Sequence, residues 1–180
     1  MLKGKRILIT GGAGSIGSEL VKQLYKNNDI YIFDIDETRM FDLVEELKIK
    51  GRVGDIRDVG AIWEAFEDFK PDTVFHAAAL KHVTPSEWTP QEYVKTNWYG
   101  TLNLVAVAKC FEVKKLINVS TDKVVEKKSN MGKTKGEAEE IVKKYGYTSV
   151  RFGNVMGSRG SVLEIWQRQA ERNEPLTVTD

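Results

Sequence analysis

The feature that most constrains the fold is a glycine-rich turn near the start of the chain. An apolar run over residues 5–10 leads into Gly11, Gly14 and Gly17, and an amphipathic stretch follows. This order predicts a strand, a tight turn and a helix. Gly11 permits the turn, Gly14 lets a pyrophosphate approach the backbone, and Gly17 allows the helix to pack closely on its strand. The turn therefore predicts a dinucleotide-binding fold.

An acidic residue at the end of the next apolar run supports this prediction. The N–H groups at the helix start, which belong to Ser15 and Ile16 among others, would face the phosphates. Asp34 follows about 20 residues later, where an acidic side chain bonds the adenosine ribose hydroxyls. Its alternative role is a helix cap, which Asp36 fills better. A carboxylate would repel a 2′-phosphate and so favours NAD over NADP, but Arg39 is near enough in sequence to weaken that preference.

The composition excludes several classes of protein. A formal net charge of +1 argues against a nucleic-acid partner. The single cysteine, Cys110, excludes an internal disulfide, and we expect it to be a buried residue at a helix end. With two histidines in the chain, no metal-ligand cluster is expected. No signal peptide precedes the first strand and no apolar run is long enough to span a bilayer, so we expect a soluble, cytoplasmic protein without membrane partners.

Strand-like runs alternate with amphipathic stretches along the whole chain, which predicts an α/β fold. We expect a doubly wound parallel sheet with helices on both faces. The six expected strands cover residues 5–10, 30–34, 49–53, 73–76, 116–120 and 147–152. Besides the helices after the glycine turn and after Asp36, helices are expected over residues 59–69, 91–111, 134–145 and 162–171. Residues 85–90 are expected to form a loop, and residues 176–180 to enter another strand.

Further cofactor contacts are expected where other strands end. Asp55 can accept from the adenine amino group while Ile56 packs on the ring. The alternative for Asp55 is a helix cap, which Asp58 already supplies. Small side chains after the fourth strand either leave room for a ligand against the backbone or allow tight helix packing. They are Ala77, Ala78 and Ala79.

Candidate catalytic groups follow the fifth strand. Thr121, Asp122 and Lys123 stand at its carboxyl end, where ligands gather in doubly wound sheets. Lys135 lies on the next helix, four residues after Met131, so the two side chains share a face. A lysine beside an aspartate in a dry site can act as a base. From charge alone, a surface Asp-Lys pair in a lysine-rich loop is the favoured interpretation.

Several segments together resemble the nucleotide-sugar 4,6-dehydratases of the extended short-chain dehydrogenase/reductase superfamily. The most similar branch is the polysaccharide-biosynthesis group that acts on UDP-N-acetylglucosamine. The similar segments are residues 10–17, 75–83, 94–97 and 120–123, the Met131-Gly132-x-x-Lys135 pattern, and residues 151–162. The Thr-Asp-Lys triplet and the Ala-Ala-Leu-Lys-His-Val stretch distinguish this branch from epimerases.

The resemblance implies a reaction with no net redox change. The oxidised cofactor takes hydride from C4 of the sugar, which acidifies the C5 proton. Lys123 would remove that proton, and Asp122 would protonate the departing C6 hydroxyl so that water leaves. Hydride then returns to C6, giving a 4-keto-6-deoxy sugar. Thr121 would hydrogen-bond near the C4 oxygen, and Lys135 would hold the nicotinamide ribose.

The resemblance also implies contacts to a UDP-sugar substrate. Asn154, Ser161 and Val162 would contact the nucleotide part. Lys81 and His82 would line the sugar pocket, although a capping or packing role for His82 is equally open. We also expect a homo-oligomer, in which Trp98 and Tyr99 belong either to a helix-pair interface or to the core.

The chain departs from the superfamily pattern at two points. Met131 stands where a tyrosine is usual, and a thioether cannot exchange the C4 hydroxyl proton. Members of the same branch also carry methionine there, so the C4 base is either Lys135, directly or through water, or Asp122. The family's catalytic domain continues for roughly a hundred residues more, the size of a typical added lobe. We therefore expect residues 1–180 to be a Rossmann domain that binds NAD or NADP, with the substrate lobe largely absent.

Two alternative functions remain open. One is a UDP-hexose 4-epimerase, which uses the same C4 oxidation without elimination. It needs a C4 base but no C5 base, so Met131 and Lys123 count against it. The other is a catalytically silent dinucleotide-binding module. Met131 and the missing lobe favour this module, whereas the Asp122–Lys123 pair and Lys135 oppose it.

Overall fold

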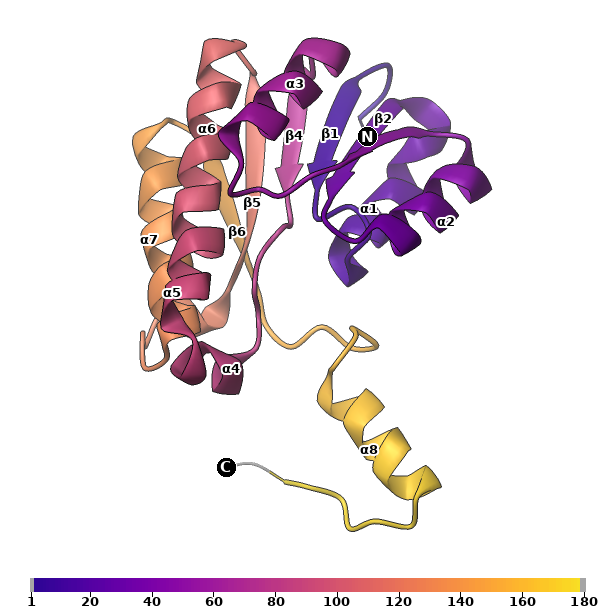
Figure 1. The fold of residues 1–180 in the computed structure, drawn as a ribbon, viewed down its shortest axis with the longest axis vertical. Helices are drawn as coiled ribbons and strands as arrows, with labels where there is room; N and C mark the ends of the chain where they lie inside the picture. Colours follow the sequence, from indigo (N-terminus) through magenta and orange to yellow (C-terminus); the bar gives the residue numbers. More distant parts are fainter. Residues whose placement is uncertain (1, 179–180) are drawn as a thin grey trace.

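The computed structural model describes residues 2–178, which form a six-stranded parallel sheet with helices on both faces (Figure 1). The strand order is β3-β2-β1-β4-β5-β6, and all neighbouring strands are parallel. The predicted doubly wound sheet is confirmed. The strands are β1 (Arg6–Thr10), β2 (Asp29–Asp34), β3 (Lys50–Val53), β4 (Thr73–His76), β5 (Lys115–Thr121) and β6 (Thr148–Phe152).

The helices fall into two layers and one outlying segment. One face of the sheet carries α1 (Ser15–Leu24) and α2 (Glu37–Leu47). The other carries α3 (Val59–Phe69), α6 (Gly100–Cys110) and α7 (Asn130–Lys144). The short helices are α4 (Val83–Trp88), α5 (Pro90–Tyr93), a π-helix (Val94–Tyr99) and 3₁₀ turns at Tyr25–Asn27 and Asp122–Val124. The last helix, α8 (Val162–Glu171), lies beyond the carboxyl ends of the strands (Figure 1).

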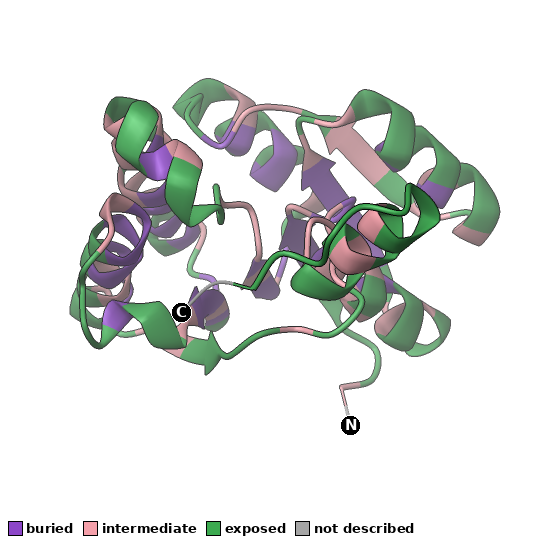
Figure 2. Ribbon diagram, turned by 90° about the horizontal axis from the view of Figure 1, so that it is seen from below, coloured by how far each residue is buried: buried purple, intermediate pink, exposed green. Residues whose placement is uncertain are grey.

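Two apolar clusters hold the layers to the sheet, because the strands are buried on both faces. Ile7, Ile9 and Ile32 pack toward α1 and α2, whereas Leu8 and Phe33 pack toward the other layer. Figure 2 shows the contrast between these buried central strands and the exposed outer segments. In α8, which is described throughout, no residue is buried.

The strand order places a crevice at the carboxyl ends of the two central strands, β1 and β4. From β1, the chain first winds outward through β2 and β3, then crosses back to β4 and winds the other way. The helices that follow β1 and β4 therefore diverge, and the gap between them opens at the carboxyl ends of the strands. The glycine turn and the small residues after β4 both lie at this switch point.

Two predictions about local structure are wrong, and a third, the long helix, holds with a modification. Residues 85–90 were expected to form a loop, yet Val83–Trp88 is helical. Pro85 is tolerated because it stands in the first turn, where its missing N–H has no helical partner. The predicted helix over 91–111 is interrupted by a π-helix, inside which the Asn97 side chain bonds both backbone groups of Leu80. Cys110 is exposed, not buried, because it ends α6 on the solvent side.

Helix and strand ends differ more modestly. The expected helix over 134–145 begins at Asn130, because the Ser129 hydroxyl accepts from the Gly132 N–H and caps it. Asp36 and Asp58 cap α2 and α3 as predicted. Residues 176–178 are not in a strand, and the remainder of that predicted strand, residues 179–180, lies outside the described residues.

Candidate functional site

The glycine turn brings the start of α1 to the switch point. Gly11 has a φ of +67°, and a Cβ there would lie 2.5 Å from the Ala78 nitrogen, so only glycine fits between β1 and the segment after β4. A Cβ on Gly17 would collide with the Gly11 carbonyl. Among the described residues, no side chain caps α1. Its first N–H groups are therefore available to an anionic ligand in the cleft.

Asp34 joins the glycine turn to the end of β2. One carboxylate oxygen accepts from the Ala13 N–H at 2.8 Å, and the other accepts from the Asp36 N–H at 3.0 Å. Each oxygen keeps a second lone pair, so the carboxylate can still accept from ribose hydroxyls. Arg39 pairs with Asp36 at 3.0 Å. This pairing offsets the charge that Arg39 would otherwise offer to a 2′-phosphate.

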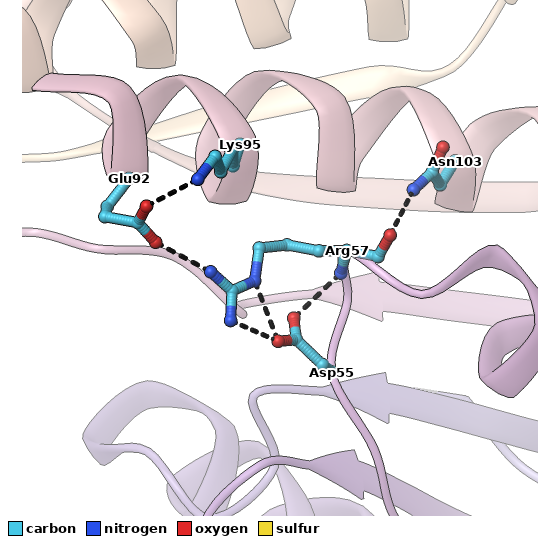
Figure 3. A network of polar contacts seen from close by, with 5 residues as sticks. All are labelled: Asp55, Arg57, Glu92, Lys95 and Asn103. Atoms are coloured by element: carbon cyan, nitrogen blue, oxygen red, sulfur yellow. Dashed lines mark hydrogen bonds and ion pairs between the residues drawn. The ribbon is translucent and has the colours of Figure 1, made fainter.

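A polar network fixes the loop after β3 (Figure 3). The Asp55 carboxylate accepts from the Arg57 backbone N–H at 2.9 Å and from its Nε at 2.7 Å. The Arg57 guanidinium lowers the pKa of Asp55, which keeps that carboxyl ionised. Arg57 also pairs with Glu92 at 2.7 Å, and Asn103 donates to the Arg57 carbonyl. The loop is thereby tied to the helices that follow β4.

A buried histidine, His76, lies at the end of β4, next to the end of β1. Thr101 donates its hydroxyl hydrogen to the Asn97 carbonyl at 2.6 Å, so it must accept from Nε2–H of His76 at 2.9 Å. Nδ1 of His76 then accepts from the Thr10 hydroxyl at 2.7 Å. Burial lowers the pKa of His76 to about 3, so the ring is neutral. It connects β1, β4 and α6.

The catalytic candidates meet at the end of β5. Nζ of Lys123 lies 3.2 Å from Oδ1 of Asp122 and 3.3 Å from Oδ1 of Asn154. The Thr121 hydroxyl donates to the same Asp122 oxygen. The side chains of Asp122 and Lys123 are 59% and 42% exposed, so this pair is open to an incoming ligand. The hydrogen bond from Lys123 is the largest cause that lowers the pKa of Asp122.

Lys135 has a different environment from Lys123. It is buried on α7, and its Nζ donates to the Val119 carbonyl at 2.6 Å. Burial lowers the pKa of Lys135 to about 8, and Glu139 opposes that shift. Glu139 is itself paired with Arg151 at 2.7 Å. Met131, also buried, lies one turn earlier on the same face of α7.

The segment after β6 crosses the mouth of the cleft. The Arg159 N–H donates to the Ser15 hydroxyl at 3.1 Å, and its guanidinium donates to the Ala13 carbonyl. Lys81 donates to the Arg159 carbonyl at 2.5 Å. The sequence prediction missed Arg159 as a site residue, because its partners Ser15 and Ala13 are more than 140 residues away in the chain. Gly160 has a φ of +66°, a backbone conformation that favours glycine, and a Cβ there would lie 2.8 Å from Cε1 of the His82 ring.

One cleft of about 1070 Å³ joins these parts. It brings together the predicted cofactor residues, the predicted substrate residues, and three of the four predicted catalytic residues. Asp122 is the exception, since the described residues around the cleft do not include it. The predicted residues that line the cleft are Gly11, Gly14, Ser15, Ile16, Gly17, Asp34, Arg39, Asp55, Ile56, Ala77, Ala78, Ala79, Lys81, His82, Thr121, Lys123, Lys135, Asn154, Ser161 and Val162.

No group of three or more His, Cys, Asp or Glu residues within 2–178 could hold a metal ion. No helix in the same range combines the length and the apolar composition needed to cross a membrane.

Curated relatives match nearly the whole chain. An uncharacterized membrane protein of Methanocaldococcus jannaschii is 47% identical over 98% of the chain and 57% of its own length. An inverting UDP-N-acetylglucosamine 4,6-dehydratase of Campylobacter jejuni and a UDP-glucose 4-epimerase of Rickettsia bellii are each 37% identical over 100% of the chain and 58% of their own length. The chain thus spans a little over half of the length of these relatives.

Solved structures and a family profile agree with this result. The crystal structure of Pen from Bacillus thuringiensis superposes with a TM-score of 0.93 at 38% identity, over 99% of this chain and 59% of that one. The Bordetella bronchiseptica enzyme WbmG, solved with NAD and UDP, gives a TM-score of 0.83 at 26% identity, over 96% of this chain and 61% of its own. The profile described as "Polysaccharide biosynthesis protein" matches residues 7–180. The resemblance found in the sequence is confirmed, and the chain belongs to this polysaccharide biosynthesis protein family.

Proposed function

We propose that these residues form the cofactor-binding and catalytic core of an NAD-dependent nucleotide-sugar 4,6-dehydratase that acts on UDP-N-acetylglucosamine. One observation carries the proposal. Thr121, Lys123 and Lys135 line the same cleft as the uncapped start of α1, and Met131 stands one turn before Lys135. A dinucleotide bound at α1 would extend from the glycine turn toward those side chains.

The residues of the cleft fit a dinucleotide. The free N–H groups of α1 suit a pyrophosphate, and the Asp34 carboxylate has lone pairs for two ribose hydroxyls. Asp55 is held ionised and can accept from an adenine amino group. Arg39 is engaged by Asp36, which supports NAD over NADP. When bound, the cofactor would supply hydride acceptance at C4 of the sugar and hydride return at C6.

The Asp122–Lys123 pair supports elimination because its two groups hold one shared proton. With the pair ionised, Lys123 is an ammonium and Asp122 a carboxylate 3.2 Å away. Passing that proton across gives a neutral amine and a carboxylic acid. Water favours the ion pair, whereas a sugar covering the exposed pair would remove water and favour the neutral form.

In the neutral form the pair has both groups that the reaction requires. The Lys123 amine takes the C5 proton, the C6–O bond breaks as the C5 electrons form a double bond to C6, and Asp122 gives its proton to the leaving hydroxyl. Water departs and the ion pair is restored. When hydride returns to C6, the Lys123 ammonium gives a proton back to C5, and the proton that the C4 hydroxyl lost on oxidation replaces the one carried off with the water. Thr121 would hold the C4 oxygen, and Lys135 would donate to the nicotinamide ribose.

A second candidate is a UDP-hexose 4-epimerase, which the Rickettsia relative favours. Epimerisation needs a group that exchanges the C4 hydroxyl proton but none that removes the C5 proton. Lys135, with a pKa of about 8, could exchange it through water. Lys123 would then be dispensable. A catalytically silent dinucleotide-binding module is the third candidate. In such a module the two lysines would change the affinity for the dinucleotide only where they touch it.

We also propose a homo-oligomer in the cytoplasm. Trp98 and Tyr99 stack with ring centroids 4.7 Å apart, and Tyr99 is exposed. Exposed aromatic rings are typical of protein interfaces. Sedimentation of the purified protein, compared with a Tyr99→Ser variant, tests this part independently of activity.

The test of the main proposal uses the complete natural polypeptide that contains these residues. It is incubated with UDP-N-acetylglucosamine and either NAD or NADP, and the products are followed by mass spectrometry. Loss of one water from the nucleotide sugar supports the dehydratase, and an isomer of unchanged mass supports the epimerase. If the substrate is unchanged while NAD still binds in a parallel titration, the result supports the catalytically silent module.

A further inference from the structure

Helix α7 packs against the catalytic turn, the 3₁₀ turn at Asp122–Val124. Gly132, on the first turn of α7, lies directly against the backbone of Lys123. A Cβ built on Gly132 would stand 2.6 Å from the Lys123 carbonyl oxygen and 3.4 Å from its carbonyl carbon. The colliding atom belongs to the backbone, so a side chain could be accommodated only if the catalytic turn or the helix moved.

The catalytic turn cannot move away freely. Val124 is 3% exposed and anchors the turn in the interior. On the other side, the Gly132 N–H is held by the Ser129 hydroxyl at 3.0 Å, and both Met131 and Gly132 are buried. The helix start and the catalytic turn are therefore fixed against each other, and the missing side chain at position 132 sets their separation.

A second glycine on the same helix provides a contrast. Gly136 is one turn further along α7 and is also buried. A Cβ there would stand 3.1 Å from Cε of Lys127, with no backbone atom among its nearest neighbours. Lys127 is exposed, so the end of its side chain can turn aside. One glycine thus contacts the backbone of a catalytic candidate and the other contacts a flexible side chain.

We propose that Gly132 is a positioning residue for Lys123: the absence of a side chain at 132 brings the Lys123 backbone close enough to α7 for Nζ to stand between Asp122 and Asn154. The role of Lys123 as the C5 base rests on the proposed function, whereas the backbone contact does not. Lys123 reaches both partners at the limit of hydrogen-bonding distance, 3.2 and 3.3 Å. A displacement of the turn would lengthen contacts that already stand at this limit.

The proposal predicts which step fails. Gly132→Ala moves Lys123 but leaves the glycine turn and Asp34 untouched, so NAD should bind as in the wild type. Oxidation at C4 should continue while removal of the C5 proton slows. We expect the turnover number to fall by about tenfold to a hundredfold, the range for a small misplacement of a reacting group. Reduced nicotinamide should accumulate in the presence of the sugar, and exchange of the C5 proton with deuterated solvent should slow in proportion.

The experiment compares Gly132→Ala with Gly136→Ala in the complete polypeptide. NAD affinity, turnover, the reduced fraction of the cofactor and C5 deuterium exchange are measured for both variants, and a crystal structure of Gly132→Ala locates the catalytic turn. Support requires unchanged NAD affinity, slower exchange and a displaced Lys123 backbone in Gly132→Ala only. Wild-type exchange rates in Gly132→Ala would overturn the proposal. Loss of NAD binding in that variant would also overturn it, since the glycine would then serve the fold as a whole.

Failure of the proposed function gives a different result. If the wild-type protein releases no water from the sugar, the dehydratase proposal falls. The crystal structure of Gly132→Ala then decides the positional claim alone. A catalytic turn that keeps its wild-type place in that variant would overturn the claim, and a displaced turn would support it.

Discussion

The two ends of the cleft are built differently. At the proposed adenosine end, Asp34 and Asp55 each accept two or more hydrogen bonds from the chain at 2.7–3.0 Å. At the proposed catalytic end, the side chains of Lys123 and Asp122 are 42% and 59% exposed and meet at 3.2 Å. A site that must bind one ligand in one orientation benefits from groups that are already fixed. A site that must move a proton needs groups that a substrate can still reach and desolvate.

This contrast assigns binding energy to one end and chemistry to the other. Substitutions at the adenosine end should therefore change NAD affinity and leave the saturated rate unchanged. Substitutions at the catalytic end should do the reverse. Substitutions at the buried His76 should change the free energy of unfolding and leave both NAD affinity and the saturated rate unchanged. Four experiments test this division.

The largest effect is expected at Lys123. Lys123→Ala removes the proposed C5 base, and loss of a general base typically lowers the rate by about a hundredfold to ten-thousandfold. NAD affinity should stay at the wild-type value, because the lysine touches no residue of the glycine turn. Steady-state kinetics with UDP-N-acetylglucosamine and a calorimetric NAD titration measure the two quantities. Lys127→Ala, an exposed lysine four residues away, is the matched control. Equal rates in both variants would remove Lys123 from the mechanism and favour the epimerase.

The next effect concerns stability and acts through His76. Its folded-state pKa of about 3 lies below the ordinary value of 6.5. Between those pH values His76 is protonated in the unfolded chain and neutral in the folded chain. The free energy of unfolding therefore falls as the pH falls below 6.5. The expected loss from this group is about 1.4 kcal/mol for each pH unit within that window.

His76→Gln should remove this part of the acid dependence. The amide can still donate to Thr101, and it does not titrate. A series of urea titrations between pH 7 and pH 4, spaced by about one pH unit, measures the free energy of unfolding at each pH. The variant should be less stable at neutral pH, because its geometry is imperfect, but its curve should be flatter. Parallel curves for the two proteins would show that His76 takes up its proton over the same pH range in the folded and the unfolded chain, so that its folded-state pKa is not lowered.

Local signals in the sequence were sufficient for the sheet and for the binding end of the cleft. Thr73–His76 and Val59–Phe69 begin and end where they were predicted, since a buried β-branched run and an Asp58 cap are readable within a few residues. The glycine turn was equally readable, because the spacing of Gly11, Gly14 and Gly17 between a strand and a helix is a pattern contained within a few residues.

Contacts between distant segments were not predictable in this way. Arg57 and Glu92 are 35 residues apart, and Arg159 reaches Ser15 across 144 residues. The break in the predicted helix over 91–111 depends on Asn97 bonding Leu80, which no periodicity reveals. Asp122 was predicted to lie with Lys123 at the catalytic site, yet it is not among the residues that line the cleft, a placement that depends on the turn that carries it.

A smaller effect is expected at Gly14, which tests the phosphate-binding part of the adenosine end. A Cβ there would meet one atom, the Gly11 carbonyl oxygen at 3.0 Å, so Gly14→Ala should fold. The added methyl group would stand where the pyrophosphate approaches the backbone, and a displaced phosphate contact costs about tenfold in affinity, or about 1.4 kcal/mol. A titration with NAD measures this loss, while thermal unfolding checks the fold. Unchanged affinity would mean that the pyrophosphate does not approach Gly14.

The smallest effect should arise at Arg57. Arg57→Gln removes the guanidinium that orients the Asp55 carboxylate, but both side chains are partly exposed and such pairs contribute only about 1 kcal/mol or less. NAD affinity should therefore fall by at most about fivefold, with the saturated rate unchanged.

A sharper readout is selectivity between NAD and its hypoxanthine analogue, in which a carbonyl oxygen replaces the adenine amino group. An ionised, oriented Asp55 attracts the amino group and repels the carbonyl oxygen, so the wild type should prefer NAD and Arg57→Gln should prefer it less. Lys95→Gln, which removes a neighbouring partner of Glu92 without touching Asp55, is the control and should keep the wild-type preference. If both variants discriminate equally well, the network around Arg57 stabilises the loop after β3 without orienting Asp55, and the adenosine end is less fixed in advance than its hydrogen bonds indicate.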